Sequence, residues 1–246
     1  IFCIVGDGES REGQVWEAVD FLAEHRLSNV VAIFNCNQFG QSDRVAEVQS
    51  PETIGKKLEA VGIAVLHVDG HDPKRLMATF DRMREHVANG RVCAIVAKTV
   101  KGWGAPCIQG GGWHGKPPVG QKLQQAKSEL TAHRSTLTSS LVVGDAFSIT
   151  PPAEAADAVA STATSFPTFT DAMRTYDKAS VLATGKFATR KAFGLALRAL
   201  GHVDPLIHVL DADVKNSTFT EWFANDRDLA PRFTQCRIAE QNMVSV

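Results

Sequence analysis

Short apolar runs alternate with amphipathic stretches through the first half of the chain. Four runs have the length of buried strands, at residues 1–5, 30–34, 61–68 and 92–97. Residues 12–25 place apolar side chains at the spacing of a helix with one buried face, and residues 73–86 form a second helix pattern. Strands that alternate with helices in this way predict an α/β fold with a parallel sheet.

The second half of the chain has a different texture. Residues 121–133 have the pattern of a polar helix, and the stretch after it is rich in Ser, Thr, Ala and Pro with little periodicity. We predict three parts from this change in composition. They are a first domain at residues 1–130, a linker at 131–166 with a short helix at 153–160, and a second domain at 167–246.

The second domain shows its own helix and strand patterns. Residues 189–200 are predicted to be helical, with Gly201 ending the helix as a C′ glycine. A short buried strand is expected at residues 206–210 and a loop at residues 215–218. A helical pattern returns at residues 237–246, so this half is expected to be α/β as well.

Polar residues follow the first two apolar runs at the point where each run ends. Gly6-Asp7-Gly8 ends the first run, and Asn35-Cys36-Asn37 ends the second. Because the carboxyl ends of parallel strands meet at one edge of a sheet, Asp7 and Asn37 are expected to lie close together. Carboxylate and amide oxygens suit Mg²⁺, which completes its shell with phosphate oxygens and water. The stretch predicts a Mg²⁺-diphosphate site, although an ordinary strand-to-helix turn has the same pattern.

Composition and charge limit the class of protein. The chain has 246 residues, of which 44% are hydrophobic and 22% charged, as in globular proteins. Its net charge of −1 gives no reason to expect a nucleic acid or a membrane as partner. Its five cysteines lack CxxC spacing, which favours reduced thiols and a cytoplasmic location over disulfides or zinc. The chain begins inside a strand pattern without an initiator Met, so we expect it to be part of a longer polypeptide.

The first motif resembles that of a known family. Gly6-Asp7-Gly8 followed by Asn37 resembles the thiamine diphosphate motif, and Glu12-Gly13 with Glu17-Ala18 looks like the transketolases in particular. The resemblance implies that thiamine diphosphate is the cofactor and that Gly8 lies against it.

The same resemblance implies a set of metal ligands. The side chains of Asp7 and Asn37 and the backbone carbonyl of Phe39 correspond to the Mg²⁺ ligands of the family, and Ca²⁺ is expected to substitute for Mg²⁺. Many relatives carry a second Asn or an Asp just before the last Asn, where this chain has Asn35-Cys36. This departure leaves the ligands themselves intact.

Two further motifs of the first domain match the family in order. Lys101-Gly102, which follows Ala97-Lys98-Thr99, resembles the end of the transketolase AKT-x-KG segment, and residues 113–117 (WHGKP) resemble a second segment. The resemblance implies that Lys101 contacts the cofactor. It also implies that His114 contacts both the cofactor diphosphate and the sugar substrate, as a catalytic residue.

The second domain continues the resemblance. Residues 187–191 (FATRK), 211–221 (DADVKNSTFTE) and 238–243 (IAEQNM) are similar to transketolase segments of the pyrimidine-binding domain. By this correspondence Arg190 and Ser217 bind the phosphate of the sugar. Glu240 is the acid that activates the cofactor by a hydrogen bond to its pyrimidine ring, and it is therefore both cofactor-binding and catalytic.

The resemblance implies a complete functional hypothesis. The fold is expected to be the three-layer thiamine diphosphate-binding fold, as two incomplete domains joined by a linker. The expected reaction moves a two-carbon ketol unit from a ketose phosphate to an aldose phosphate, in the pentose phosphate pathway. The active site is expected to lie between the subunits of a homodimer, with Glu12 and Glu17 near the two-fold axis. We expect the complete protein to be an enzyme and this chain alone to be inactive.

Three alternatives to this hypothesis are open. Another thiamine enzyme, such as a deoxyxylulose phosphate synthase or the decarboxylating component of a 2-oxo acid dehydrogenase, shares the first motif but not the later ones in this order. A non-catalytic transketolase-like binding module is disfavoured by the intact Asp7, Asn37, His114 and Glu240. A Rossmann-type nucleotide binder needs GxGxxG after the first strand, and residues 6–13 (GDGESREG) lack that spacing.

Overall fold

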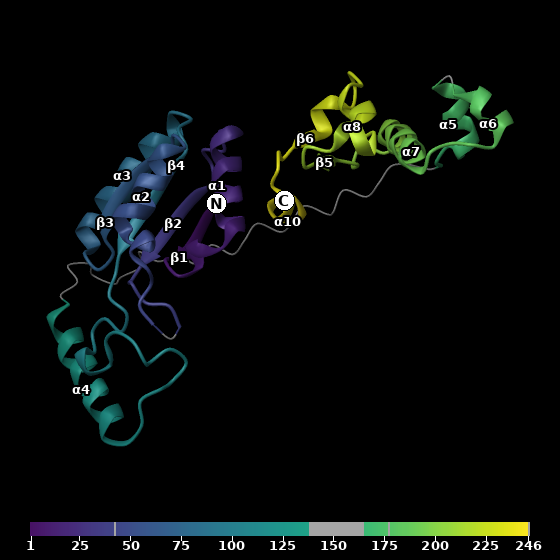
Figure 1. The fold of residues 1–246 in the computed structure, drawn as a ribbon. Helices are drawn as coiled ribbons and strands as arrows, with labels where there is room; N and C mark the ends of the chain where they lie inside the picture. Colours follow the sequence, from purple (N-terminus) through teal and green to yellow (C-terminus); the bar gives the residue numbers. More distant parts are fainter. Residues whose placement is uncertain (42, 138–164, 177, 246) are drawn as a thin grey trace. The chain divides into compact units, whose positions relative to one another are not determined.

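The computed structural model describes residues 1–41, 43–137, 165–176 and 178–245. The chain divides into two compact units, residues 1–146 and 147–246 (Figure 1). The helix predicted at residues 153–160 lies outside the described residues. No described helix combines the length and apolar character needed to cross a membrane.

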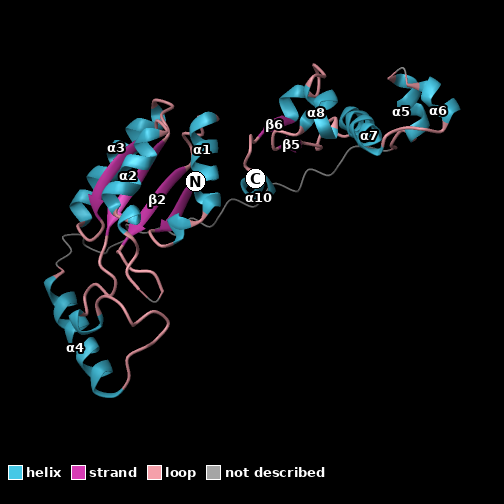
Figure 2. Ribbon diagram, viewed as in Figure 1, coloured by secondary structure: helices cyan, strands magenta, loops and turns pink. Residues whose placement is uncertain are grey.

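A four-stranded parallel sheet forms the centre of the first unit (Figure 2). Its strands are β1 (Phe2–Gly6), β2 (Val31–Cys36), β3 (Ala64–Asp69) and β4 (Cys93–Lys98). The strand order is β1-β2-β4-β3, and every pair is parallel. All four predicted strands are therefore confirmed, although the third begins three residues later than the apolar run.

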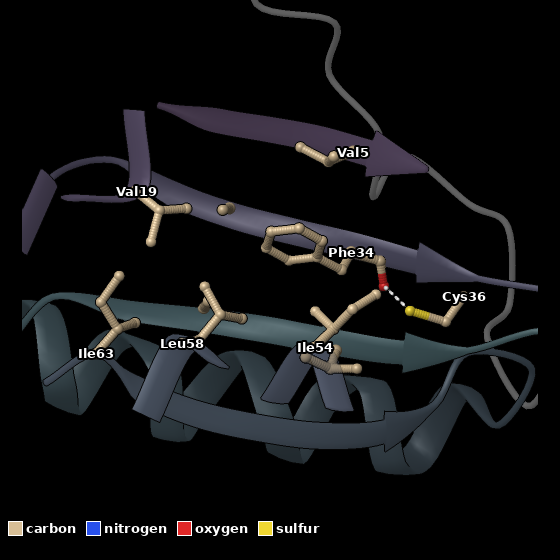
Figure 3. Packing of buried hydrophobic residues seen from close by; sticks show 10 residues of the cluster. Val5, Val19, Phe34, Cys36, Ile54, Leu58 and Ile63 are labelled. Carbon is tan, nitrogen blue, oxygen red and sulfur yellow. Dashed lines mark hydrogen bonds between the residues drawn. The ribbon is translucent and has the colours of Figure 1, made fainter. Parts of the chain in front are cut away.

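Helices cover both faces of this sheet. They are α1 (Gly13–Glu24), α2 (Pro51–Ala60) and α3 (Pro73–Ala88). Side chains of α1 and α2 share one buried cluster with β1, β2 and β4, whereas α3 packs on a separate cluster on the opposite face. Figure 3 shows the ring of Phe34 among Val5, Ile54 and Leu58 in the first cluster. Two helix layers around a parallel sheet are the predicted three-layer arrangement.

The helix α2 was not predicted from the sequence. Its start is well marked, because Ser50 Oγ accepts a hydrogen bond from the Thr53 N–H at 3.3 Å and Pro51 occupies the first turn. Its buried face rests on few large side chains, chiefly Ile54 and Leu58. Gly55 lets the helix approach β3 closely, since a Cβ there would lie 2.6 Å from the ring of His67.

The outer strand β1 is the least covered part of the sheet. Phe2 is 59% exposed and Ile4 is 71% exposed, and the ring of Phe2 packs at right angles to the ring of Phe80 from α3, with the centroids 6.1 Å apart. Apolar side chains of a parallel sheet are normally covered on both faces. The described residues thus leave an apolar patch on β1.

A long loop and one helix complete the first unit. The polar helix predicted at residues 121–133 is α4 (Gly120–Thr136), and it extends into the stretch predicted as linker. Trp103 joins this helix to the turn after β3. Its ring stacks on His71 at 4.3 Å and meets the His133 ring of α4 edge-on at 4.4 Å. The described part of this unit also contains the 3-10 turns η1 (Glu9–Arg11), η2 (Glu47–Gln49) and η3 (Pro106–Ile108).

The second unit is mainly helical. Its elements are α5 (Phe169–Thr175), α6 (Ala179–Thr184), α7 (Thr189–Val203), β5 (Val209–Asp211), α8 (Lys215–Thr218), α9 (Glu221–Ala224), η4 (Ala230–Arg232), β6 (Phe233–Gln235) and α10 (Glu240–Ser245). Strands β5 and β6 form a two-stranded parallel sheet. The strand predicted at residues 206–210 is therefore the shorter β5, and the last helix begins three residues later than predicted.

Two other predictions for this unit are wrong. Residues 215–218, expected as a loop, form the short helix α8. Gly201 does not end its helix, because α7 continues to Val203 and is capped at Asp204. Gly201 is instead buried where the helix meets the ring of Phe223, and a Cβ at this position would clash with that ring. The glycine serves close packing rather than chain reversal.

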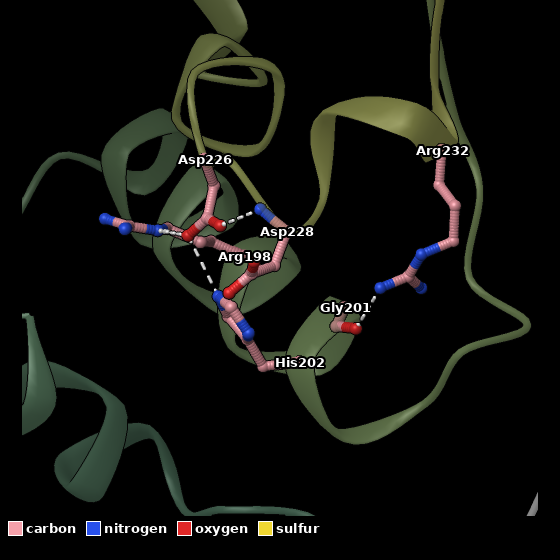
Figure 4. A network of polar contacts seen from close by, with 6 residues as sticks. All are labelled: Arg198, Gly201, His202, Asp226, Asp228 and Arg232. Atoms are coloured by element: carbon pink, nitrogen blue, oxygen red, sulfur yellow. Dashed lines mark hydrogen bonds and ion pairs between the residues drawn. The ribbon is translucent and has the colours of Figure 1, made fainter.

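A buried carboxylate ties α7 to the segment after α9 (Figure 4). Asp226 accepts hydrogen bonds from Arg198 Nε at 2.8 Å and the Asp228 N–H at 3.1 Å, and its Oδ2 lies 2.9 Å from His202 Nε2. Burial raises the pKa of Asp226, but the bonds from His202, Arg198 and the Asp228 N–H outweigh it and lower the pKa from 3.8 to about 2. Asp226 is therefore a charged anchor of this unit.

Candidate functional site

The turn after β1 holds a buried carboxylate. Asp7 is 2% exposed, and its Oδ1 accepts the Gly8 N–H at 2.8 Å. Its Oδ2 accepts the Gln38 N–H from the loop after β2, so the two strand ends are joined directly. The sequence prediction that these segments meet at the carboxyl edge of the sheet is confirmed.

Two side chains that the sequence analysis missed hold this turn. Gln49 Nε2 donates to the carbonyl oxygens of Asp7 at 2.7 Å and Gly8 at 3.2 Å, and Gln49 itself is buried. Ser10 Oγ donates to the same Asp7 carbonyl at 2.6 Å. No motif marks Gln49, which lies 42 positions after Asp7.

The loop after β2 positions the other predicted metal ligands. Asn37 Oδ1 accepts the Phe39 N–H at 2.9 Å, and Gln38 between them has the left-handed φ of 65°. Farther along this loop, the Gly40 N–H donates to the Asp43 carbonyl at 2.8 Å. Hydrogen bonds within this loop thus link Asp7, Asn37 and Phe39.

Residues 101–114, which include the glycines 110–112, fold over this loop. Lys101 Nζ donates to the Gly40 carbonyl at 2.6 Å and lies 3.3 Å from His114 Nδ1. Cβ atoms built on Gly110 and Gly111 would lie 3.4 and 3.5 Å from the ring of Phe39, so the segment crosses that ring at close range. Lys101 and His114 are therefore brought to the loop that carries Asn37 and Phe39.

The donor set fits a divalent cation. Burial raises the pKa of Asp7, and this effect outweighs the N–H bonds from Gln38 and Gly8, which lower it. Among the described residues no lysine or arginine forms an ion pair with this carboxylate. A carboxylate, an amide oxygen and a backbone carbonyl are hard oxygen donors, which Mg²⁺ prefers. A metal ion would supply the positive charge that Asp7 lacks.

The departure at Asn35-Cys36 has a structural role. Asn35 Oδ1 accepts a hydrogen bond from Thr99 Oγ1 at 2.6 Å, which ties β2 to the loop after β4. Cys36 is fully buried, and burial together with the nearby charges of Asp7 and Glu52 raises the pKa of its thiol to about 12. The thiol beside the predicted metal ligand is therefore a packed apolar group.

The predicted residues of the second unit are exposed. Arg190 lies at the start of α7, with its guanidinium carbon 5.6 Å from the ring centroid of Phe219, and Ser217 lies in α8 two residues before that ring. Glu240 begins α10 next to the buried Ala239. Arg190 contacts the ring of Phe219, and Ser217 lies just before Phe219 in the chain. Glu240 lies on a different element, α10.

Two known protein families match this chain. Residues 1–178 match the family described as transketolase, thiamine diphosphate binding domain. The chain belongs to the transketolase family. Residues 185–246 match a second family of these proteins, the transketolase pyrimidine binding domain.

Individual transketolases agree with this assignment. The chain is 38% identical over 251 residues to transketolase of Mus musculus and 37% identical to that of Homo sapiens, each match covering 100% of this chain and 36% of the relative. It is also 36% identical to transketolase-like protein 2 of Bos taurus. The chain therefore spans about a third of the length of these relatives.

Solved structures show the same fold. Transketolase from Campylobacter jejuni matches with a TM-score of 0.60 at 16% identity, covering 100% of this chain and 40% of that one. A Pichia stipitis transketolase, solved in complex with sedoheptulose 7-phosphate, matches with a TM-score of 0.59 at 15% identity over 98% of this chain and 40% of that one. The chain has the parallel α/β fold of thiamine diphosphate-binding proteins that the sequence predicted.

Proposed function

We propose that the protein containing this chain is a transketolase that uses thiamine diphosphate and Mg²⁺. It transfers a two-carbon ketol unit from a ketose phosphate to an aldose phosphate, as in the pentose phosphate pathway, and acts in the cytoplasm. The observation that carries the proposal is the joining of Asp7 to the loop of Asn37 and Phe39, with Lys101 and His114 folded over that loop.

The residues of the first unit are assigned to the diphosphate end of the cofactor. Asp7, Asn37 and the Phe39 carbonyl would hold the metal ion, whose charge would balance the diphosphate. Gly8, without a side chain, lets the backbone approach the phosphate groups. Lys101 adds a positive charge that balances the diphosphate. When bound, thiamine diphosphate would supply a nucleophilic carbon, and its cationic ring would take up the electron pair left by carbon–carbon cleavage.

The remaining residues are assigned to proton and substrate handling. His114 donates a hydrogen bond to sugar hydroxyls, and Arg190 with Ser217 binds the distal phosphate of the sugar. Glu240 hydrogen-bonds the pyrimidine ring of the cofactor and controls the proton on it. In the proposed homodimer, Glu240 of one subunit acts on a cofactor held by Asp7 and Asn37 of the other. This chain alone is then expected to be inactive.

Calorimetry of the full-length protein tests the metal and cofactor assignment. Asp7→Ala is expected to abolish Mg²⁺-dependent binding of thiamine diphosphate, because a hard ligand and its charge are lost. Asp20→Ala, on the exposed face of α1, is the matched control and is expected to bind like the wild type. Unchanged binding by Asp7→Ala would refute the metal site.

Turnover tests the reaction. Glu240→Ala is expected to retain cofactor binding and lose activity, and wild-type activity in that variant would refute the role of the acid. A substrate panel separates the thiamine enzymes, because a transketolase uses xylulose 5-phosphate with ribose 5-phosphate, and a 2-oxo acid enzyme uses pyruvate. A non-catalytic binding module is the second candidate, since the matches include proteins whose names say only that they are like transketolase. It would bind the cofactor without turning over either substrate.

A further inference from the structure

Two cationic side chains share one aromatic ring at the start of α7. The guanidinium carbon of Arg190 and the Nζ of Lys191 each lie 5.6 Å from the ring centroid of Phe219. This distance is within the range of cation–π attraction, which draws a cation toward the negative face of a ring. Exposed lysines usually sample many rotamers, so the ring restricts where the ammonium of Lys191 lies.

The ring itself is held firmly in place. Phe219 has a left-handed φ of 63°, which is uncommon for a bulky residue. A Cβ built on Gly194 would lie 2.5 Å from the Phe219 carbonyl oxygen, so only glycine at this point of α7 admits the turn. The ring of Trp222 packs beside it at 5.0 Å. The backbone and ring of Phe219 are therefore fixed against α7.

A buried carboxylate fixes the chain on both sides of this ring. Asp211, at the end of β5, accepts hydrogen bonds from Thr220 Oγ1 at 2.8 Å and Thr218 Oγ1 at 3.4 Å. Its other oxygen accepts the Val214 N–H at 2.9 Å, at the start of α8. The segment that carries Ser217 is thereby tied to the same turn as the ring that holds the two cations.

We propose that Lys191 is a second phosphate-binding residue and that Phe219 is the positioning residue that holds the Lys191 ammonium and the Arg190 guanidinium at the turn that follows Ser217. The proposal rests on the proposed function, in which Arg190 and Ser217 bind the phosphate of the sugar. A phosphate monoester carries nearly two negative charges at neutral pH, and one guanidinium balances only one of them. A second fixed cation gives the site a preference for a dianionic phosphate over a neutral sugar.

Binding and kinetics of the full-length protein test the role of Lys191. Lys191→Gln is expected to raise the Kd for ribose 5-phosphate, measured by calorimetry, about tenfold, as for loss of a charged hydrogen-bond partner. The KM for ribose 5-phosphate should rise similarly, while kcat and the KM for glycolaldehyde, an acceptor without phosphate, stay unchanged. Lys191→Arg should restore tight binding. Lys186→Gln, a control at an exposed lysine before α7, should behave as the wild type.

Phe219 is tested by a pair of substitutions. Phe219→Leu removes the ring and is expected to raise the Kd for ribose 5-phosphate about tenfold, whereas Phe219→Tyr keeps the ring face and should restore it. If Phe219→Leu does not fold, Lys191→Gln decides the question alone. Equal ribose 5-phosphate affinities for Lys191→Gln and Lys186→Gln would overturn the proposal. Failure of the wild type itself to bind ribose 5-phosphate would instead overturn the proposed function and this inference with it.

Discussion

Lys101 Nζ lies 3.3 Å from the Nδ1 of His114 and donates at the same time to the Gly40 carbonyl. A lysine ammonium has only donors, so Nδ1 must present its lone pair to it. With Nδ1 accepting, Nε2 is the ring nitrogen that carries a proton. Lys101 therefore sets which ring nitrogen of His114 can donate a hydrogen bond, the property that the proposed function requires of this histidine.

The tautomer of His114 can be measured directly. In full-length protein with ¹⁵N-labelled histidine, we expect the His114 signals to show the Nε2–H form, assigned with a His114→Gln variant. Lys101→Met should give a mixture of both tautomers, because the donor facing Nδ1 is gone. Lys116→Met, two residues beyond His114, is the control and should match the wild type. An Nδ1–H tautomer in the wild type would contradict the assignment.

Gln49 is expected to stabilise the turn that carries Asp7. Gln49→Met keeps most of the side-chain volume but removes the donor to two carbonyls, and should lower the free energy of unfolding by about 1–3 kcal/mol. The exposed Gln124→Met on α4 is the control and should change it little. Urea unfolding of the full-length protein measures both, and equal midpoints for the two variants would argue against the role of Gln49.

We expect that a larger residue in place of Gly201 destabilises the protein, although this glycine lies inside a helix. Alanine favours helices over glycine by about 1 kcal/mol, yet a methyl group here would press on the ring of Phe223. Gly201→Ala should therefore be destabilising overall, by about 1–3 kcal/mol for overpacking. Gly13→Ala is the matched control, since no atom lies within 4 Å of a Cβ at the start of α1. Thermal unfolding should show a lower Tm for the first variant and an unchanged or higher Tm for the second.

We expect the protein to lose stability in acid, where Asp226 becomes protonated. Its pKa is about 2 in the folded protein and near 3.8 when unfolded, so the unfolded state binds more protons between these values. The contribution of its charge is complete above about pH 4 and disappears as the pH falls toward 2. The shift corresponds to about 2 kcal/mol.

The stabilisation that the Asp226 charge provides is measured from the pH dependence of unfolding in the wild type and in Asp226→Asn. Asp226→Asn should be less stable than the wild type at neutral pH, and the difference should shrink steadily below pH 4. The exposed Asp81, paired with Arg84 on the surface, is the control, and Asp81→Asn should show a small, nearly constant difference. A difference for Asp226→Asn that stays constant down to pH 2 would contradict the assigned charge state.

The parts of the fold that the sequence predicted are those with a strong local signal. The four strands of the first unit are continuous apolar runs, and α3 has both a helical period and the capping Asp72. In contrast, α2 has only a narrow apolar face, so its Ser50-Pro51 start was the signal to use. Gly201 was misjudged because glycine marks both helix ends and close packing, and only the ring of Phe223 distinguishes them.

The residues of the candidate site also fall into two groups, those that a local motif marks and those that only the tertiary fold brings together. Asp7, Asn37, Lys101 and His114 were predicted because they belong to short motifs, and the structure brings them to one loop. Gln49 belongs to no motif, and its bonds to the Asp7 turn depend on the tertiary fold. Lys191 and Phe219 lie inside recognised motifs, but their relation appears only when α7 and α8 are packed together.

The left-handed backbone of Gln38 has a consequence for anyone who redesigns the protein for heat resistance. A non-glycine residue in this conformation is disfavoured by roughly 1 kcal/mol, so Gln38→Gly is the kind of substitution that stability engineering selects first. The same twist aims the Gln38 N–H at Asp7 and sets Asn37 and Phe39 on either side. A glycine would relieve the strain at Gln38, but it would also free the backbone between Asn37 and Phe39, the two residues of this loop that the proposed function assigns to the metal site.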